Sequence, residues 1–334
     1  MTARIAVIGA GAVGGALAAL ADRHGHEVAV TARGAQLDAI RSRGLRLSGA
    51  WGDHTARLRA SEVLTESPEL ALVTVKAQDA PAALAENARL LEGVPLVVVQ
   101  NGLGGAEAAA SRLPDTPVIG ALALFAASFL EPGEVKVTTG GTTYLGRIDA
   151  TPADVFDEAA SILSGFMPTE ITDNFTGAQW TKLIVNHVNA LPAITGLSVQ
   201  QTVWDARLRR VLTASIQETI RIARARGVRF EALLGLSDRV LGVVGHAPRS
   251  LAELLPRVMA RRMGPVPNPG STLQSIRRGQ LTEIDHLNGA VVAEARAAGL
   301  RAPVNAALVA LVHAVENDHR FRTPSEVYDV ALPA

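Results

Sequence analysis

The first half of the chain alternates short apolar runs with amphipathic stretches. Two of these runs, 69–76 and 95–101, are almost continuously apolar, which is typical of strands buried on both faces of a sheet. A helical pattern over 12–23 follows the first run. Strands that alternate with helices predict a parallel sheet covered by helices on both sides. The predicted strands lie at 4–9, 26–33, 69–76, 95–101 and 118–125.

The segment 134–148 has a different pattern. Its sequence, EVKVTTGGTTYLGRI, alternates polar and apolar residues, is rich in Thr and Val, and has Gly140-Gly141 at its centre. Two alternating runs around a glycine pair are typical of a β-hairpin. We expect an antiparallel hairpin at the edge of the sheet.

From about residue 175 the hydrophobic pattern becomes helical and stays so. The Pro- and Gly-rich stretch 263–271 interrupts it as a loop, and Ser271-Thr272 is a candidate helix N-cap. We therefore expect an α/β domain of the Rossmann type over 1–170 and an all-α domain over 171–334. The predicted helices of the second domain lie at 177–190, 205–226, 250–262, 271–278, 283–298 and 304–317.

Three polar side chains interrupt the apolar helix pattern of residues 180–196, WTKLIVNHVNALPAITG. On an α-helix Asn186 lies about 40° from Lys182, and Asn189 lies about 20° to its other side, so all three share one face. His187 points away from that face, as a core or surface residue. A buried ammonium or amide needs partners. The stripe therefore faces solvent, another part of the protein, or a ligand.

A glycine pattern stands where the first strand meets the first helix. Residues 9–14 read GAGAVG, which is G-x-G-x-x-G in a strand–turn–helix context. Gly9 allows the tight turn, Gly11 lets a pyrophosphate approach the backbone, and Gly14 allows close packing of helix on strand. Together with Ala10, Ala12 and Val13 these glycines form a candidate dinucleotide-binding loop at a helix N-terminus.

The end of the second predicted strand indicates which dinucleotide binds. The strand ends VTAR, with Arg33 where NAD-binding folds usually carry an acidic residue. An arginine suits a 2′-phosphate, which favours NADPH over NADH, although Arg33 could also be a solvent-facing residue. Lys76 and Asn101 follow two further strands, at the sheet edge where ligands bind; each could equally be a solvated loop residue.

Composition excludes several classes of protein. The 334 residues carry equal numbers of basic and acidic side chains, which argues against nucleic acid as the main partner. The absence of cysteine excludes disulfides, thiolate catalysis and cysteine-ligated metals. The eight histidines show no metal-binding spacing, so we expect no metal. With no signal-peptide pattern and no long apolar run, we expect a cytoplasmic protein that does not enter a membrane.

Two carboxylates begin a predicted helix in QLTEIDHLNGAVV, residues 280–292. Glu283 and Asp285 would lie in its first turns, where carboxylates often only cap the helix. We keep that interpretation for Asp285. Glu283 is a candidate partner for Lys182, because a buried lysine needs a carboxylate or strong acceptors.

These motifs, in this order, resemble the ketopantoate reductase (2-dehydropantoate 2-reductase) family along nearly the whole chain. The matching pieces are IGAGAVGG, the Arg33 strand end, VTVKAQD, VVVQNGLGG, WTKLIVN, PGSTLQSIRRGQLTEIDHLNG and APVN. The resemblance implies a Rossmann domain followed by an all-α domain like the C-terminal domain of 6-phosphogluconate dehydrogenase, with the active site in the cleft. It also implies NADPH-dependent reduction of ketopantoate to pantoate, on the route to pantothenate and coenzyme A.

The resemblance assigns roles to matched residues. Lys182 matches the catalytic lysine that donates a proton to the ketone oxygen, and Glu283 matches the acid that helps set the substrate and that lysine. Ser271 matches a serine that binds the substrate carboxylate, and Asn186 matches a substrate-binding asparagine. The remaining matches are Asn101 and Lys76, near nicotinamide and substrate, and Arg33, at the cofactor phosphate.

The second helix asparagine departs from the family pattern. Well-known members carry it four residues after the first, but here that position is Ala190, and Asn189 comes one residue early. Asn189 remains a candidate substrate-binding residue, because three and four residues apart both return to one helix face. The shift leaves open another small branched 2-oxo acid, or a derived imine, as substrate.

Two further questions stay open. A non-catalytic, NADP-sensing protein would not need Lys182, Asn186, Ser271 and Glu283 together, which argues against that alternative. The helical domain could pair with a copy of itself as a homodimer, although no apolar stripe requires it.

Overall fold

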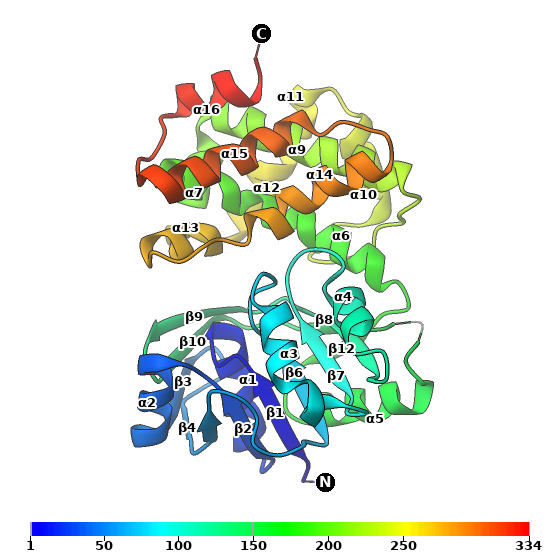
Figure 1. The fold of residues 1–334 in the computed structure, drawn as a ribbon. Helices are drawn as coiled ribbons and strands as arrows, with labels where there is room; N and C mark the ends of the chain where they lie inside the picture. The colour runs from blue at the N-terminus through cyan, green and yellow to red at the C-terminus, as the bar shows by residue number, and fades with distance from the viewer. Residues whose placement is uncertain (1, 149, 334) are drawn as a thin grey trace. The chain divides into compact units, whose positions relative to one another are not determined.

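The computed structural model describes residues 2–148 and 150–333. The chain divides into two compact units, Met1–Phe175 and Thr176–Ala334. The first unit is α/β and the second is helical (Figure 1). Among the described residues, no helix is long and apolar enough to cross a membrane.

The main sheet of the first unit has eight strands in the order β12-β11-β8-β7-β6-β1-β2-β5. The neighbours from β8 to β5 all pair in parallel, as the alternation of strands and helices predicts. β11 pairs antiparallel with β8, and β12 pairs parallel with β11. These strands are β1 (Arg4–Ile8), β2 (Glu27–Thr31), β5 (Arg59–Ser61), β6 (Leu70–Val73), β7 (Leu96–Val99), β8 (Val118–Ala123), β11 (Thr143–Arg147) and β12 (Thr169–Ile171).

Alternate residues of the central strands pack into two separate cores. Ile5 and Val7 of β1 belong to one core, and Ala6 and Ile8 belong to the other. Side chains of α1 and α5 complete the first core, and side chains of α3 and α4 complete the second. This is why the strands read as continuous apolar runs. The helices of this unit are α1 (Ala12–Arg23), α2 (Gly34–Arg43), α3 (Ala80–Leu91), α4 (Gly105–Arg112) and α5 (Ala153–Ser164).

The hairpin predicted for 134–148 is wrong. Its two halves are strands of different sheets: β10 (Glu134–Thr139) pairs with β3 and β9, whereas β11 pairs with β8. Between them the backbone of Gly141 packs so tightly that an added Cβ would lie 2.6 Å from the Leu124 carbonyl oxygen. The glycine pair therefore carries the chain from one sheet to the other. The other strands of this smaller sheet are β3 (Leu45–Gly49), β4 (His54–Ala56) and β9 (Ala126–Glu131).

Phe175, the last residue of the first unit, packs over two glycines of the main sheet. Gly120 of β8 and Gly146 of β11 lie opposite each other in the sheet. The Phe175 side chain covers both: an added Cβ would lie 2.1 Å from its ring at Gly120 and 2.2 Å from its Cβ at Gly146. The two glycines thus make room for an aromatic side chain at the start of helix α6.

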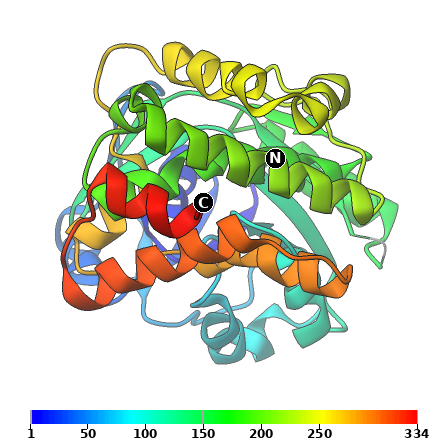
Figure 2. The same cartoon turned by 90° about the horizontal axis from the view of Figure 1, so that it is seen from above.

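Helix α9, the longest of the second unit, is the centre of its packing. Its N-terminus is capped by the Asp205 carboxylate, which accepts hydrogen bonds from the Arg207 and Leu208 N–H groups. Figure 2 shows α9, in light green, running between α12 in yellow and α15 in orange-red, and it packs against both. The helices and 3₁₀ turns of the unit are α6 (Phe175–Asn186), η1 (His187–Asn189), α7 (Ala190–Thr195), α8 (Val199–Trp204), α9 (Ala206–Ala225), α10 (Asp238–His246), α11 (Arg249–Ala252), α12 (Leu254–Arg262), α13 (Gly270–Arg277), η2 (Ile284–His286), α14 (Asn288–Ala297), α15 (Pro303–Asp318) and α16 (Pro324–Ala331).

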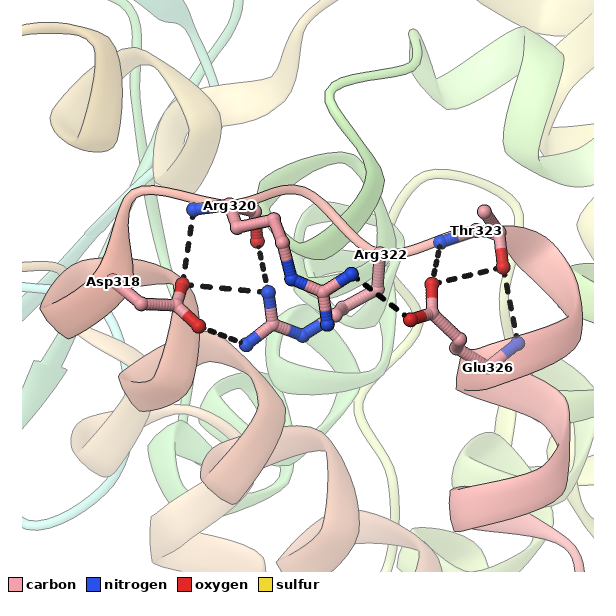
Figure 3. Close-up of polar contacts among 5 residues, drawn as sticks. All are labelled: Asp318, Arg320, Arg322, Thr323 and Glu326. Carbon is pink, nitrogen blue, oxygen red and sulfur yellow. Dashed lines mark hydrogen bonds and ion pairs between the residues drawn. The ribbon is translucent and has the colours of Figure 1, made fainter.

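The turn between α15 and α16 is fixed by charged side chains (Figure 3). Thr323 and Glu326 form a capping box at the start of α16, with the Thr323 N–H donating to the carboxylate at 2.7 Å. Arg320 also donates to Glu326, and Arg322 pairs with Asp318. These contacts cap the start of α16 and tie the loop before it to Asp318, the last residue of α15.

The glycine loop offers a matched test of its packing. At Gly14 an added Cβ would lie 2.1 Å from the Gly9 carbonyl oxygen and 2.2 Å from Thr74 Oγ1, whereas at Gly11 nothing lies within 4 Å. We expect Gly14→Ala to lower the free energy of unfolding by ~1–3 kcal/mol or more. Gly11→Ala should lower it by less than ~1 kcal/mol. Urea unfolding of both variants measures this, and equal losses would contradict the packing role of Gly14.

Candidate functional site

The loop between β1 and α1 has the shape that a dinucleotide requires. Gly9 has φ +105°, and its N–H donates to Thr31 Oγ1 at 3.0 Å. Thr74 Oγ1 donates to the Gly9 carbonyl oxygen at 2.7 Å, so the turn is held from both neighbouring strands. Gly11, at the N-cap of α1, is exposed and faces open space. The first N–H groups of the helix have no partner within the helix, so the loop fits a pyrophosphate.

An ion pair occupies the end of β2. Arg33 lies at the N-cap of α2, and its Nη2 donates to both carboxylate oxygens of Glu86, at 2.6 and 2.8 Å. Both side chains are exposed to solvent. The sequence has no acidic residue at the end of β2. In the folded chain Glu86, on α3, takes that place beside Arg33. The sequence carried no signal for Glu86, which is 53 residues away.

Lys76 and Asn101 follow neighbouring strands of the sheet, β6 and β7. Both residues are half-buried. The Lys76 carbonyl oxygen accepts the N–H groups of Asp79 and Ala80, which closes the turn into α3. Asn101 begins the glycine-rich loop before α4. The carboxyl ends of two adjacent parallel strands therefore carry these side chains, as their spacing in the sequence predicts.

Lys182 is buried in the second unit. It lies in α6, only 9% exposed, between the buried residues Thr181 and Leu183. Burial lowers the pKa of Lys182 to about 8, and the negative charge of Glu283 opposes part of that shift. The ammonium is thus desolvated and attracted by a carboxylate, and with a pKa of about 8 it is mostly protonated at neutral pH.

Glu283 lies outside the helix in which the sequence placed it. The segment 284–286 forms a 3₁₀ turn with Glu283 at its N-cap, and α14 begins only at Asn288. The Glu283 carbonyl oxygen accepts the N–H groups of His286 and Leu287. Asp285 does not cap a helix; its carboxylate contacts His313 Nε2 at 3.0 Å. The expectation that both acids begin an α-helix is therefore wrong, because the turn tightens before the helix starts.

Residues just before and just after Glu283 are bound by two residues of α15. We call these four residues, Thr282, Asp285, His313 and Glu316, the clamp. The Thr282 N–H donates to Glu316 Oε1 at 2.8 Å, and His313 bridges Glu316 and Asp285. Burial alone lowers the pKa of His313, but hydrogen bonds and charges from Asp285 and Glu316 outweigh it and raise that pKa. Burial alone raises the pKa of Glu316, but the bonds from Thr282 and His313 lower it. The clamp ties the Glu283 segment to α15.

The asparagines of the polar stripe lie in different surroundings. Asn186, the last residue of α6, is half-buried, whereas Asn189, in η1, is 9% exposed. Asn189 Oδ1 accepts a hydrogen bond from the Ser271 N–H at 3.3 Å. The structure thus brings Asn189 to Ser271 and Lys182 to Glu283, within one unit.

A buried polar network joins α9, α14 and α15 of the second unit. Its centre is Asn305, whose Oδ1 accepts from Ser215 Oγ and Asn288 Nδ2, both at 2.8 Å. Asn305 Nδ2 donates to Glu218 Oε2 at 2.6 Å. Asn288 belongs to TEIDHLNG and Asn305 to APVN, two motifs whose asparagines had no expected role. Sequence reasoning missed the network, because its members become neighbours only when α9, α14 and α15 pack.

His187 extends the network as an uncharged side chain. Its Nε2 lies 2.6 Å from Thr219 Oγ1, and that hydroxyl donates its only proton to the Ser215 carbonyl oxygen. His187 Nε2 must therefore carry the hydrogen of the contact. Burial lowers the pKa of His187 to about 3, so it is neutral at physiological pH. His187 is a core residue, one of the two interpretations that the sequence allowed.

Comparison with known proteins identifies the family. The family model described as "Ketopantoate reductase PanE/ApbA" matches residues 5–150, and the model of its C-terminal domain matches residues 174–316. The chain belongs to the ketopantoate reductase family. The 2-dehydropantoate 2-reductase of Halobacterium salinarum is 32% identical, over 94% of this chain and 99% of that protein. The corresponding protein of Archaeoglobus fulgidus is 28% identical, over 94% of this chain and 98% of its own length.

Solved structures of the family have the same fold. The PanE/ApbA family ketopantoate reductase of Ralstonia eutropha JMP134 superposes with a TM-score of 0.79 at 31% identity. The match covers 94% of this chain and 99% of that one. A ternary structure of D-mandelate dehydrogenase with NADH and anilino(oxo)acetate also gives 0.79, at 20% identity and the same coverage. At that identity the second likeness shows the fold alone. The expected Rossmann-type domain followed by an all-α domain is thus confirmed.

The clamp predicts a pH-dependent contribution to stability. Because the pKa of His313 is raised in the folded protein, its contribution is complete below the ordinary value of 6.5 and is lost as pH rises through the raised value. We expect the loss of unfolding free energy in His313→Gln to be largest at mildly acidic pH and to shrink above neutrality. Chemical denaturation at several pH values measures it, with the exposed His246→Gln as control. A loss that does not change with pH would contradict the clamp.

Proposed function

We propose that the protein reduces 2-dehydropantoate to pantoate with NADPH. The observation that carries this proposal is the buried Lys182, whose pKa is about 8 and whose neighbour is Glu283. A desolvated ammonium is suited to stabilise and protonate a ketone oxygen. The names of the relatives support the substrate, since they are 2-dehydropantoate 2-reductases over nearly the full length of the chain.

The residues of the first unit fit the cofactor. The loop Gly9–Gly14 would hold the pyrophosphate, Arg33 the 2′-phosphate, and Lys76 and Asn101 the nicotinamide side. When bound, the reduced nicotinamide supplies the hydride that converts the keto carbon to an alcohol. The preference for NADPH over NADH rests on Arg33, whose guanidinium is positioned at the end of β2.

Residues of the second unit would bind the 2-oxo acid and move the proton. Ser271 binds the carboxylate, and Asn186 hydrogen-bonds the substrate. As the ketone oxygen gains negative charge, Lys182 donates its proton, so the product is a neutral hydroxyl and Lys182 is left as an amine. Glu283 helps to position the ammonium, and its charge keeps the pKa of Lys182 from falling further.

The experiment that tests this proposal is an assay of purified protein with ketopantoate, following oxidation of NADPH and, in parallel, NADH. Turnover that is much faster with NADPH supports the substrate and the cofactor together. A panel of other branched 2-oxo acids, with and without amines, is run in parallel. Binding of NADPH without turnover of ketopantoate, but with turnover of another member of the panel, would replace the substrate and keep the reaction. NADPH binding with no turnover of any substrate would favour an NADP-sensing protein.

Lys182→Ala should retain cofactor affinity and lose most turnover. Removing a positioned general acid typically costs about 10²–10⁴-fold in rate. In the wild type, kcat/KM for reduction should fall as pH rises above about 8, where Lys182 loses its proton. Steady-state kinetics and NADPH titration measure both effects. If Lys182→Ala turns over within a few-fold of the wild type, Lys182 is not the proton donor.

Replacing Arg33 and replacing Glu86 should shift the cofactor preference in opposite directions. A 2′-phosphate loses a charged hydrogen-bond donor in Arg33→Ala, so the NADPH-to-NADH ratio of kcat/KM should fall about 10- to 100-fold. Glu86 competes for the same guanidinium and repels a phosphate, so Glu86→Gln should raise that ratio about two- to fivefold. If both variants keep the wild-type ratio, the 2′-phosphate does not bind at this ion pair.

A further inference from the structure

The spacing of the two asparagines matches a local change of helix type. Residues 187–189 form the 3₁₀ turn η1, and ψ is −15° at Asn186 and −23° at Asn189. In a 3₁₀ helix there are three residues per turn, so side chains three apart eclipse each other. The turn therefore returns Asn189 to the side of Asn186 after three residues instead of four.

The Asn189 carboxamide lies directly against the start of α13. Gly270, the first residue of that helix, has φ +71°, and a Cβ added to it would lie 2.6 Å from Asn189 Oδ1. The next residue, Ser271, donates its N–H to the same oxygen at 3.3 Å. Only a glycine lets the chain pass so close to a buried amide.

The start of α13 depends on side chains from outside the helix. The first N–H groups of any helix lack partners within it. Here the Gly270 N–H donates to Asn268 Oδ1 at 2.8 Å, and the Ser271 N–H donates to Asn189. Pro269, at the N-cap position, gives no side-chain hydrogen bond. Asn189 is thus the group that ties the backbone of Ser271 to the 3₁₀ turn η1, which follows the helix bearing Lys182.

The orientation of the Asn189 amide follows from this contact. A backbone N–H must meet an acceptor, so the oxygen of the amide faces Ser271. An aspartate at position 189 would keep that acceptor, lose the two amide hydrogens and add a negative charge. An alanine would remove the acceptor and leave the Ser271 N–H beside a cavity.

We propose that Asn189 is a positioning residue, which holds the α13 N-terminus so that Ser271 meets the substrate carboxylate. The inference rests on the proposed function for the role of Ser271. Asn189 acts through Ser271. The 3₁₀ turn and the close approach at Gly270 let Asn189 reach Ser271 although it comes one residue earlier than in the family pattern. The early asparagine is then a requirement of this site.

The test is a double-mutant cycle on Asn189 and Ser271, with KM for the 2-oxo acid, kcat and the Kd of NADPH as readouts. We expect Asn189→Ala to raise KM about tenfold, the size of one hydrogen bond, with little change in kcat or in NADPH affinity. The double variant should be no worse than Ser271→Ala to within about twofold, because the two residues act as one unit. Effects that multiply in the double variant would overturn the proposal.

Further variants separate positioning from direct contact with the substrate. Asn189→Asp keeps the acceptor but adds a negative charge beside an anionic substrate, so its readout is exchange of the Ser271 N–H and not KM. If Asn189→Asp accelerates that exchange as much as Asn189→Ala does, the acceptor does not hold the Ser271 N–H and the positioning role is wrong. Gly270→Ala should reproduce Asn189→Ala from the opposite side of the contact. The matched control is Ser275→Ala. It removes another hydrogen bond of the Ser271 backbone, from Ser275 Oγ to the carbonyl oxygen at 3.4 Å, and leaves the Ser271 N–H contact intact.

Amide hydrogen exchange at Ser271 gives a readout that does not depend on activity. We expect Asn189→Ala to accelerate exchange of the Ser271 N–H, and Asn189→Asp and Ser275→Ala to leave it near the wild-type rate. Should the wild type turn over no 2-oxo acid, the proposed function fails while this measurement still decides the contact. Unchanged exchange in Asn189→Ala would overturn the positioning role.

Discussion

The organisation of the second unit depends on the cost of burying one ammonium group. Lys182 is almost completely removed from solvent, and such a charge is unfavourable by several kcal/mol unless an opposite charge and hydrogen bonds compensate it. Glu283 supplies the charge, but it lies on a short 3₁₀ turn and not on a helix. The turn alone would not hold a carboxylate in place. The clamp formed by Thr282, Asp285, His313 and Glu316 holds the turn against α15, so α15 contributes to the surroundings of a lysine on α6.

Much of the fold could be predicted, because it depends on local periodicity. The buried parallel strands and the helical second half follow from the pattern of apolar residues alone. The failed hairpin at 134–148 shows the limit of such reasoning. Each half of that segment has the alternation of a half-buried strand, yet alternation does not specify the partner strand. Which sheet a strand joins is decided by tertiary packing around Gly141.

The candidate site, like the fold, was predictable only in its local features. The stripe of Lys182, Asn186 and Asn189 and the glycine loop are visible in sequence, since helix and turn geometry are local. Glu86 beside Arg33 and His313 beside Asp285 are not, because nothing along the chain relates residues 53 or 28 positions apart. The contact between Asn189 and Ser271 is likewise invisible, as it depends on how α13 packs on η1. Long-range partners, and hence electrostatics, require the structure.

The buried network around Asn305 changes what the family motifs mean. Asn288 and Asn305 bond each other, and Ser215 and Glu218 also bond Asn305 within the buried core. Replacing one member alone removes a partner from a buried polar group, which costs about 1–3 kcal/mol, so a change at one of these positions favours a compensating change at another. Their presence in another chain therefore reports that the helical core is intact. In this chain the hydrogen bonds of these two asparagines go to other core residues, so the two motifs are evidence for the fold of the helical unit before they are evidence for a substrate.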